Sequence, residues 1–267
     1  MPRIAAKSLT SLLDVAHVLA DRAGAEILPF FRKGVAAENK AKIGFDPVTA
    51  ADMAAERVIR KILAQACPDH GIVGEELGES SGAGRYTWVI DPIDGTRAFL
   101  TGYPLWGVLI GLMDGEHAVL GLMDQPFTGE RFWATPKGAF MRIGAGKEHP
   151  IKTRACNSLE QAVLASTAPE MFKTREEKAG FAAVSNAVRM TRFGGDCYAY
   201  AMLAAGNIDI VVEAGLKAVD IVALIPIIER AGGRITTWDG KAATSGGRIV
   251  AAGDPKIHAA ALKLLAL

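Results

Sequence analysis

One short segment constrains the fold of this chain more than any other. Residues 88–97 read WVIDPIDGTR, and Asp91 and Asp94 stand at the end of an apolar run that has the character of a buried strand. A carboxylate in such a place costs several kcal/mol unless its charge is compensated. The intervening proline disfavours helix at Asp91, while Gly95 permits a sharp turn before a helix that starts at Thr96. Both carboxylates then share one small space, which is tolerable at neutral pH only with a cation.

This arrangement predicts a particular chemistry. Carboxylate oxygens select magnesium, manganese or calcium over zinc. The amides of Gly95 and Thr96, at the start of a helix, would form a receptor for an anion such as phosphate. Carboxylates for a divalent cation beside amides for phosphate indicate a phosphoryl-transfer site. Taken alone, the segment could also be a plain turn, because Asp-Pro and Asp-Gly are common turn formers.

Three further carboxylates lie in positions that could complete the site. Glu75 ends an apolar run in GIVGEELG, and Asp220 stands at a predicted helix N-terminus in LKAVDIVAL. Asp52 follows Thr49 by three residues, which also fits the capping box of a helix. Both roles of Asp52 are compatible. Walker A, GxGxxG and HExxH patterns are absent from the sequence, so the usual support for nucleotide cradles, Rossmann cofactors and zincins is missing.

The periodicity of apolar residues predicts an α/β (α+β layered) fold in two parts. Helical spacing covers residues 8–33 and 49–66, and the stretch 88–133 reads as a sheet with tight turns, including a hairpin at Asp114-Gly115. Strands and helices alternate after about residue 150, which favours a mainly parallel sheet. The helices expected there cover residues 174–188, 196–206 and 219–231 and a last helix opened by Asp254-Pro255. We place a boundary at residue 147, between subdomains 1–147 and 148–267.

Composition excludes several classes of protein. The chain has 267 residues, half of them apolar, which is enough for a substantial core and rules out a disordered or fibrous protein. A net charge of +1 without a basic stripe argues against nucleic acid and anionic membranes as partners. Three scattered cysteines fit a reducing compartment. With no signal peptide or spanning segment in view, the sequence predicts a cytoplasmic protein that acts on small molecules.

Three ordered motifs resemble a known family. GEE at 74–76, DPIDGT at 91–96, and VD followed by an apolar helix ending in AGG at 219–233 are similar to the inositol monophosphatase family of Mg²⁺-dependent phosphatases. The fuller segments FDPVTAAD, RFGGDCYAY and GLKAVDIVALIPIIERAGG most resemble its histidinol-phosphate phosphatase branch. The resemblance covers nearly the whole chain and implies an alternating αβαβα sandwich. One departure is Val219, where the family often has tryptophan.

The resemblance implies a set of metal ligands. Two or three magnesium ions per subunit would be bound by Glu75, Asp91, the Ile93 carbonyl, Asp94 and Asp220. Asp91 would bridge two of these ions.

The resemblance also implies how the reaction is catalysed. Asp52 and Thr96 would form a pair that, with Glu75, orients a metal-bound water for in-line attack on phosphorus. Gly95 and Thr96 would hold the phosphate through their amides. A lysine that the family has before FDPVT corresponds to Lys40 or Lys42.

The resemblance further implies that three residues face the organic part of the substrate: Arg192, Asp196 and Glu213. Arg192 could instead pair with a nearby carboxylate. Asp196 follows a Gly-Gly turn and opens a predicted helix, so it could be only an N-cap.

Three readings of function follow. The chain could hydrolyse L-histidinol phosphate in histidine biosynthesis, or act on inositol monophosphate or another sugar or nucleotide phosphate, or bind metal and a phosphometabolite without turnover. A mere binder would not need Asp52, Glu75 and Thr96. Asp196 favours histidinol phosphate, whose ammonium and imidazole call for carboxylates, whereas a neutral polyol needs mainly hydrogen bonds. The family resemblance also implies a homodimer.

Overall fold

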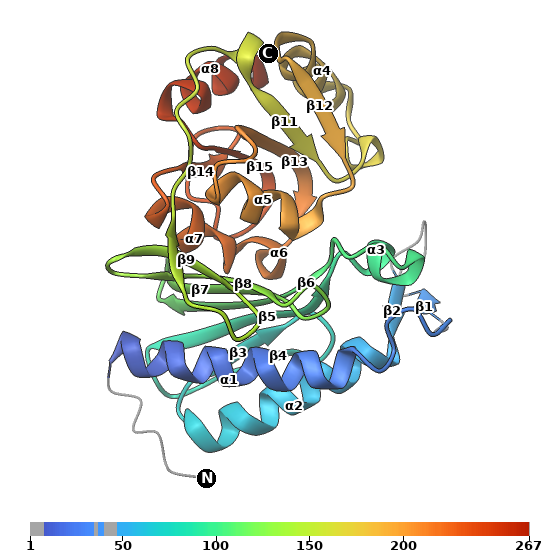
Figure 1. Ribbon diagram of the computed structural model, residues 1–267, viewed down its shortest axis with the longest axis vertical. Helices are drawn as coiled ribbons and strands as arrows, with labels where there is room; N and C mark the ends of the chain where they lie inside the picture. The colour runs from blue at the N-terminus through green and yellow to red at the C-terminus, as the bar shows by residue number, and fades with distance from the viewer. Residues whose placement is uncertain (1–7, 35–36, 40–46, 267) are drawn as a thin grey trace.

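The computed structural model describes residues 8–34, 37–39 and 47–266, and it stacks helices and sheets in five layers (Figure 1). Two N-terminal helices form the first layer, an eight-stranded sheet the second, short helices the third, a five-stranded sheet the fourth and two more helices the fifth. This is the αβαβα sandwich that the sequence predicted. Within the described ranges no helix is both long and apolar enough to cross a membrane.

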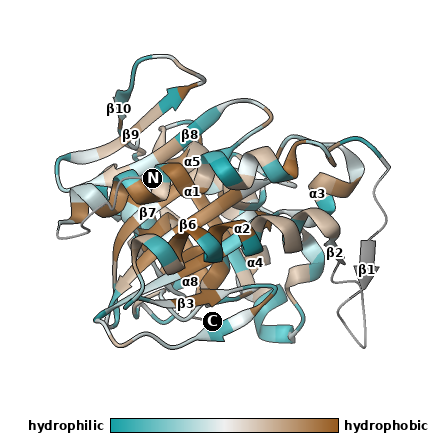
Figure 2. Cartoon of the chain, turned by 90° about the horizontal axis from the view of Figure 1, so that it is seen from below, coloured by the Kyte–Doolittle hydropathy of each residue, from teal (hydrophilic) through white to brown (hydrophobic). Residues whose placement is uncertain are grey.

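The first layer is made by α1 (Leu9–Ile27) and α2 (Ala50–Ala66). Apolar residues three and four apart bury one face of α1 against the sheet, as the helical spacing predicted. The helix ends at Ile27 rather than at residue 33, because Pro29 has no amide to continue the bonding pattern. Seen from below, both helices lie across the sheet, and strongly hydrophobic colouring gathers around β6 (Gly107–Asp114) (Figure 2).

The eight-stranded sheet carries the DPIDGT segment near its centre. In spatial order its strands are β10 (His149–Ile151), β9 (Gly138–Ile143), β8 (Glu130–Thr135), β7 (His117–Gln125), β6, β5 (Tyr86–Asp94), β3 (Gly71–Gly74) and β4 (Gly78–Ser80). Only the β3–β5 pair is parallel among these described strands. The predicted hairpin joins β6 to β7, with Gly115 at a φ of 58° that suits glycine. Two short strands, β1 (Ala37–Asn39) and β2 (Pro47–Thr49), pair separately.

The five-stranded sheet corrects one expectation. Its spatial order is β12 (Met190–Phe193), β11 (Val163–Ser166), β13 (Ile210–Leu216), β15 (Gly247–Ala252) and β14 (Arg234–Thr237). The prediction of a mainly parallel sheet was wrong, because β13–β15 and β14–β15 are antiparallel and only the two pairs made by β11 are parallel. The connection 238–246 is too short for the crossover of about a dozen residues that a parallel pair requires.

Helices cover both faces of this second sheet. Between the sheets lie α5 (Asp196–Ala204), α6 (Ala218–Ile221) and α7 (Leu224–Arg230), and the outer layer holds α4 (Arg175–Ala187) and α8 (Pro255–Leu265). The helix predicted over 219–231 is broken between α6 and α7, where Pro226 removes a hydrogen bond and crowds the carbonyl four residues earlier. The remaining short elements are α3 (Thr96–Thr101) and the 3₁₀ turns η1 (Leu159–Gln161) and η2 (Pro169–Met171).

Four hydrophobic clusters hold the layers together. Three are large: one under α1 and α2, one between the sheets around α5 and α7, and one under α4 and α8. A small fourth cluster packs Val219 and Val222 against Val89 of β5. The middle cluster joins both halves of the chain. Strand β10 pairs with β9, so the first sheet extends past residue 147 to Ile151. A division into two subdomains at residue 147 stays a prediction.

Candidate active site and metal centre

The strand end at Asp91 and Asp94 is shaped by local hydrogen bonds. Strand β5 shifts its register against β6 between these two residues: Asp91 pairs with Leu109 and Asp94 with Gly107, so the segment between them bulges out of the regular ladder. Asp91 Oδ1 accepts the amide of Ile93 at 3.0 Å, and the Thr96 hydroxyl donates to the Ile93 carbonyl at 3.1 Å. Gly95 adopts φ 86°, a left-handed conformation that suits glycine, and caps the start of α3. The turn predicted from DPIDGT is therefore present, and it folds two carboxylates into one cavity.

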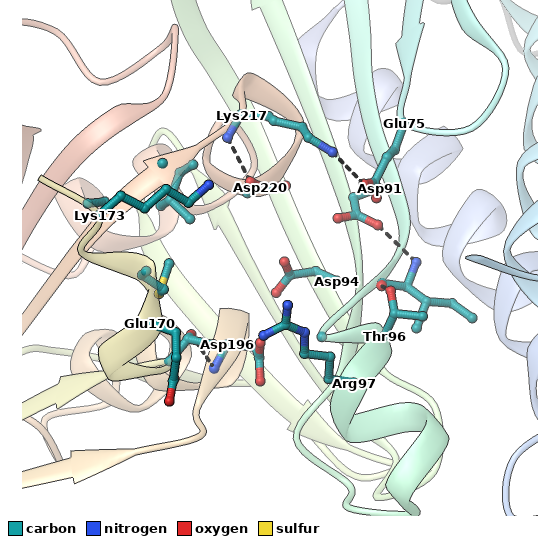
Figure 3. A pocket seen from close by; sticks show the side chains of 17 residues that line it. Glu75, Asp91, Asp94, Thr96, Arg97, Glu170, Lys173, Asp196, Lys217 and Asp220 are labelled. Atoms are coloured by element: carbon teal, nitrogen blue, oxygen red, sulfur yellow. Dashed lines mark hydrogen bonds and ion pairs between the residues drawn. The ribbon is translucent and has the colours of Figure 1, made fainter. Parts of the chain in front are cut away.

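The loop after β3 and the helix α6 bring further carboxylates to the same place. Oxygen atoms of Asp91, Asp94 and Asp220 all lie within 4.8 Å of one another. Glu75, which follows β3, lines the same cavity of about 300 Å³, as do Gly95 and Thr96 (Figure 3). The sequence-predicted metal ligands, including Ile93, are thus neighbours in space.

The electrostatics of this cluster favour a cation. Burial, and next the charge of Glu75, raise the pKa of Asp91 well above its usual range. Burial, followed by the charges of Asp196 and Asp220, does the same for the pKa of Asp94. These carboxylates oppose one another's ionisation, and a hard cation shared between their oxygens would remove that conflict. The donor set contains only oxygen, so it fits magnesium better than zinc.

Two contacts hold individual ligands in place. Asp94 Oδ2 accepts the amide of Cys197 at 2.7 Å, and Asp220 Oδ2 accepts the amide of Lys217 at 2.7 Å. Lys217 Nζ also pairs with Glu75 Oε1 at 3.0 Å. A lysine ammonium therefore neutralises part of the acidic cluster (Figure 3).

Asp52 makes the capping contact expected of it, while its role in orienting water stays a prediction. Its Oδ2 accepts the amide and the hydroxyl of Thr49 at 2.8 and 2.6 Å, so the predicted capping box of α2 is confirmed. Its Oδ1 is buried and has no hydrogen-bond partner among the described residues. Burial raises the pKa of Asp52, and the charge of Glu75 contributes to the rise. An unsatisfied buried oxygen beside Glu75 suits a site completed by water or a cation.

Of the three predicted substrate residues, only Asp196 lines the cavity. It adopts a φ of 43° that is uncommon outside glycine. The alternative role of Asp196 as N-cap is wrong, because Gly195 occupies that position and Asp196 is the first residue of the helix α5. Burial raises the pKa of Asp196 to about 6, against the opposing charge of Arg97. Arg192 is exposed on β12 and does not line the cavity.

Glu213 lies behind the cavity wall and is 1% exposed. Its two oxygens accept the amide of Thr167 at 2.8 Å and the hydroxyl of Tyr200 at 2.9 Å. Burial raises the pKa of Glu213 to about 7. Direct contact of Glu213 and Arg192 with substrate stays a prediction that this arrangement does not support.

Four charged residues of the cavity were missed in the sequence: Arg97, Glu170, Lys173 and Lys217 (Figure 3). Arg97 directly follows DPIDGT and Lys217 precedes Asp220 by three residues, so both were within reach of motif reasoning. Glu170 belongs to η2 and Lys173 follows that turn by two residues, in a segment that has no pattern of its own. Lys40 and Lys42 lie outside the described residues.

Comparisons with known proteins agree with this geometry. A family model described as the inositol monophosphatase family matches residues 8–266. The chain belongs to the inositol monophosphatase family. Members of this family are phosphatases that are generally metal-dependent, so we identify the chain as a phosphatase.

Individual relatives are named for different activities. The chain is 41% identical to the chloroplastic bifunctional phosphatase IMPL2 of Arabidopsis thaliana over 99% of this chain and 80% of that protein. It is 36% identical to the histidinol-phosphatase of Streptomyces coelicolor over 92% of this chain and 93% of that protein. An inositol monophosphatase from Zymomonas mobilis superposes with a TM-score of 0.86 and 39% identity, covering 98% of this chain and all of that one.

Proposed function

We propose that this phosphatase hydrolyses L-histidinol phosphate to L-histidinol and phosphate with magnesium as cofactor. The observation that carries the proposal is the carboxylate of Asp196 in the same cavity as the acidic cluster. Histidinol has an ammonium and an imidazole, and a half-buried carboxylate beside the reacting phosphate would recognise them. The name of the Streptomyces coelicolor relative supports the same substrate.

Five groups would hold magnesium, as two or three ions per subunit: Glu75, Asp91, the Ile93 carbonyl, Asp94 and Asp220. When bound, magnesium supplies an activated water and charge stabilisation for the leaving oxygen. Asp91 is central to the cluster and suits the role of a shared ligand.

The remaining chemistry falls to residues of the chain. The amides of Gly95 and Thr96 would hold the phosphate, and the cations of Arg97 and Lys173 would attract its negative charge. Thr96, Glu75 and the unsatisfied Oδ1 of Asp52 would orient the attacking water. Water attacks phosphorus, the ester P–O bond breaks, and the alcohol leaves with a proton.

Inositol monophosphate is the second candidate substrate. The close superposition with the Zymomonas mobilis inositol monophosphatase favours it. Arg97 beside Asp196 would also let that carboxylate act as a hydrogen-bond acceptor for a neutral polyol.

Phosphate release from a panel of phosphomonoesters with Mg²⁺ tests the assignment. We expect the specificity constant for histidinol phosphate to exceed those for inositol, sugar and nucleotide monophosphates by at least about tenfold, or about 1.4 kcal/mol. Comparable rates across the panel would overturn the specific substrate while leaving the phosphatase activity in place.

We further propose a cytoplasmic homodimer. The family resemblance supports the dimer, and light scattering on the purified protein measures it. The three cysteines, Cys67, Cys156 and Cys197, are buried free thiols, which suits a reducing compartment such as the cytoplasm.

A further inference from the structure

A buried carboxylate on α2 has no part in the chemistry described so far. Glu56 lies one helical turn after Asp52, and its side chain is 0% exposed. Glu56 Oε2 accepts the amide of Glu76 at 2.8 Å, and Oε1 accepts the amide of Leu77 at 3.2 Å. A carboxylate that accepts backbone N–H groups fixes the conformation of the segment that donates them.

Arg60 completes this arrangement on the next turn of α2. Its Nε donates to Glu56 Oε1 at 2.8 Å. The rest of the guanidinium donates to the Gly78 carbonyl and, at 3.2 Å, to the Ser80 hydroxyl. The buried charge of Glu56 is therefore paired, and the pair ties α2 to strand β4.

The segment that Glu56 holds is the one that presents Glu75. The amide of Glu75 itself donates to the Ile90 carbonyl of β5 at 3.2 Å. Three successive amides, at residues 75, 76 and 77, are thus anchored, the first by the strand of the metal site and the next two by Glu56.

Gly74 shows how closely this loop approaches the carboxylate. A Cβ atom at Gly74 would lie 1.9 Å from Glu56 Oε1 and 2.9 Å from an Arg60 nitrogen. Glycine is therefore required because the loop lies directly on the Glu56–Arg60 pair. This contact explains why the GEE motif begins with glycine, and the metal site explains why glutamate follows at position 75.

We propose that Glu56 is a positioning residue for Glu75. By accepting the amides of the two following residues, Glu56 fixes the direction in which the Glu75 side chain enters the cavity. Metal affinity depends on such preorganisation, because a ligand that must first be ordered binds more weakly. This inference rests on the proposed function, in which Glu75 is a magnesium ligand.

Glu56→Gln is the test variant. Glutamine keeps the shape, but its NH₂ group cannot accept a hydrogen bond and faces an N–H donor in either orientation. Calorimetric titration of Mg²⁺ into metal-free protein should show binding weakened by about ten- to a hundredfold, the range for groups that orient a metal ligand. The half-activating Mg²⁺ concentration for phosphate release should rise by a similar factor.

Asp209→Asn is the matched control. Asp209 is 2% exposed, accepts the amide of Val163 at 2.7 Å, and pairs with Arg154 at 2.7 and 2.6 Å. Like Glu56, Asp209 is a buried carboxylate that accepts a backbone amide and pairs with an arginine, but it lies in the second half of the chain and does not line the cavity. The control should lose stability while its Mg²⁺ affinity stays within about twofold of wild type.

Circular dichroism first establishes that each variant is folded, and Glu56→Asp, which keeps the charge but shortens its reach, replaces Glu56→Gln if that variant is unfolded. Wild-type Mg²⁺ affinity in the folded variant would overturn the positioning role and leave the metal site intact. An equal loss of affinity in the Asp209→Asn control would overturn it too, because the effect would then be one of general stability. Wild-type protein that does not bind Mg²⁺ would instead overturn the proposed function on which this inference rests.

Discussion

Glu213 should make the protein less stable as the pH rises, and replacing it by glutamine should remove this loss of stability. Its carboxyl group is 1% exposed and accepts two hydrogen bonds, yet burial raises its pKa from 4.5 to about 7. In the unfolded chain the same group ionises near its ordinary pKa. Below about pH 4.5 both states are protonated and Glu213 opposes folding least. Between pH 4.5 and about 7 the unfolded state loses its proton while the folded state keeps it. The free energy of unfolding therefore falls as the pH rises through this range.

The size of the effect follows from the same two pKa values, 4.5 and about 7. One pKa unit corresponds to about 1.4 kcal/mol, so ionised Glu213 lowers the free energy of unfolding by about 3 kcal/mol above neutral pH. Glutamine resembles the protonated carboxyl group. Its oxygen can accept from the Thr167 amide, and its NH₂ group can donate to the Tyr200 hydroxyl, which can accept as well as donate. Glu213→Gln should therefore gain up to about 3 kcal/mol at about pH 8 and almost nothing at about pH 4.5.

Urea unfolding of both proteins in EDTA, at several pH values between those limits, measures the difference. Other titrating groups, including the metal ligands, are common to both proteins and cancel in the comparison. A variant destabilised equally at both ends of the range would refute the reasoning, because Glu213 would then be ionised and favourably held in the folded state.

Three variants separate the roles proposed in the cavity. Asp91→Asn should abolish Mg²⁺-dependent phosphate release, and Mg²⁺ should raise the melting temperature of wild type but not of this variant, as thermal unfolding with and without EDTA will show. Thr96→Ala should lower the turnover number by about a hundredfold with little change in calorimetric Mg²⁺ affinity, because only the water-orienting hydroxyl is lost. Asp196→Asn should lower the specificity constant for histidinol phosphate by about 1–3 kcal/mol in transition-state terms and leave that for inositol phosphate nearly unchanged. An unaltered ratio of the two constants would remove Asp196 from substrate recognition.

The parts of the site that the sequence predicted are those fixed by short-range geometry. Asp91 and Asp94 are three residues apart, and a proline and a glycine determine the turn that brings them together. The capping box at Thr49 and Asp52 is equally local. Such features depend on a few backbone angles, so they can be predicted without knowing the rest of the fold.

The parts that sequence reasoning missed depend on which layers pack together. Alternation along β13 places Glu213 and Val211 on one face, but it does not say that Tyr200 of α5 covers that face and buries the carboxylate. Glu170 and Lys173 reach the cavity only because the η2 segment lies beside β13. Contacts between segments this far apart in the chain leave no periodic pattern in either of them.

The acidic cluster also links the metal site to the stability of the layered fold. Glu75 and Asp91 belong to the first sheet, whereas Asp220 belongs to α6, which packs on β5 from the layer between the sheets. Folding buries Asp91 and brings these charges together, and both effects raise its pKa. The metal-free protein therefore carries a repulsion that the unfolded chain lacks. A cation that binds only the folded arrangement removes this repulsion and adds its own binding energy. Metal loss should therefore loosen first the contact of α6 with β5 and the loop after β3. Protection of the amides from hydrogen exchange should fall there before the three large hydrophobic clusters open.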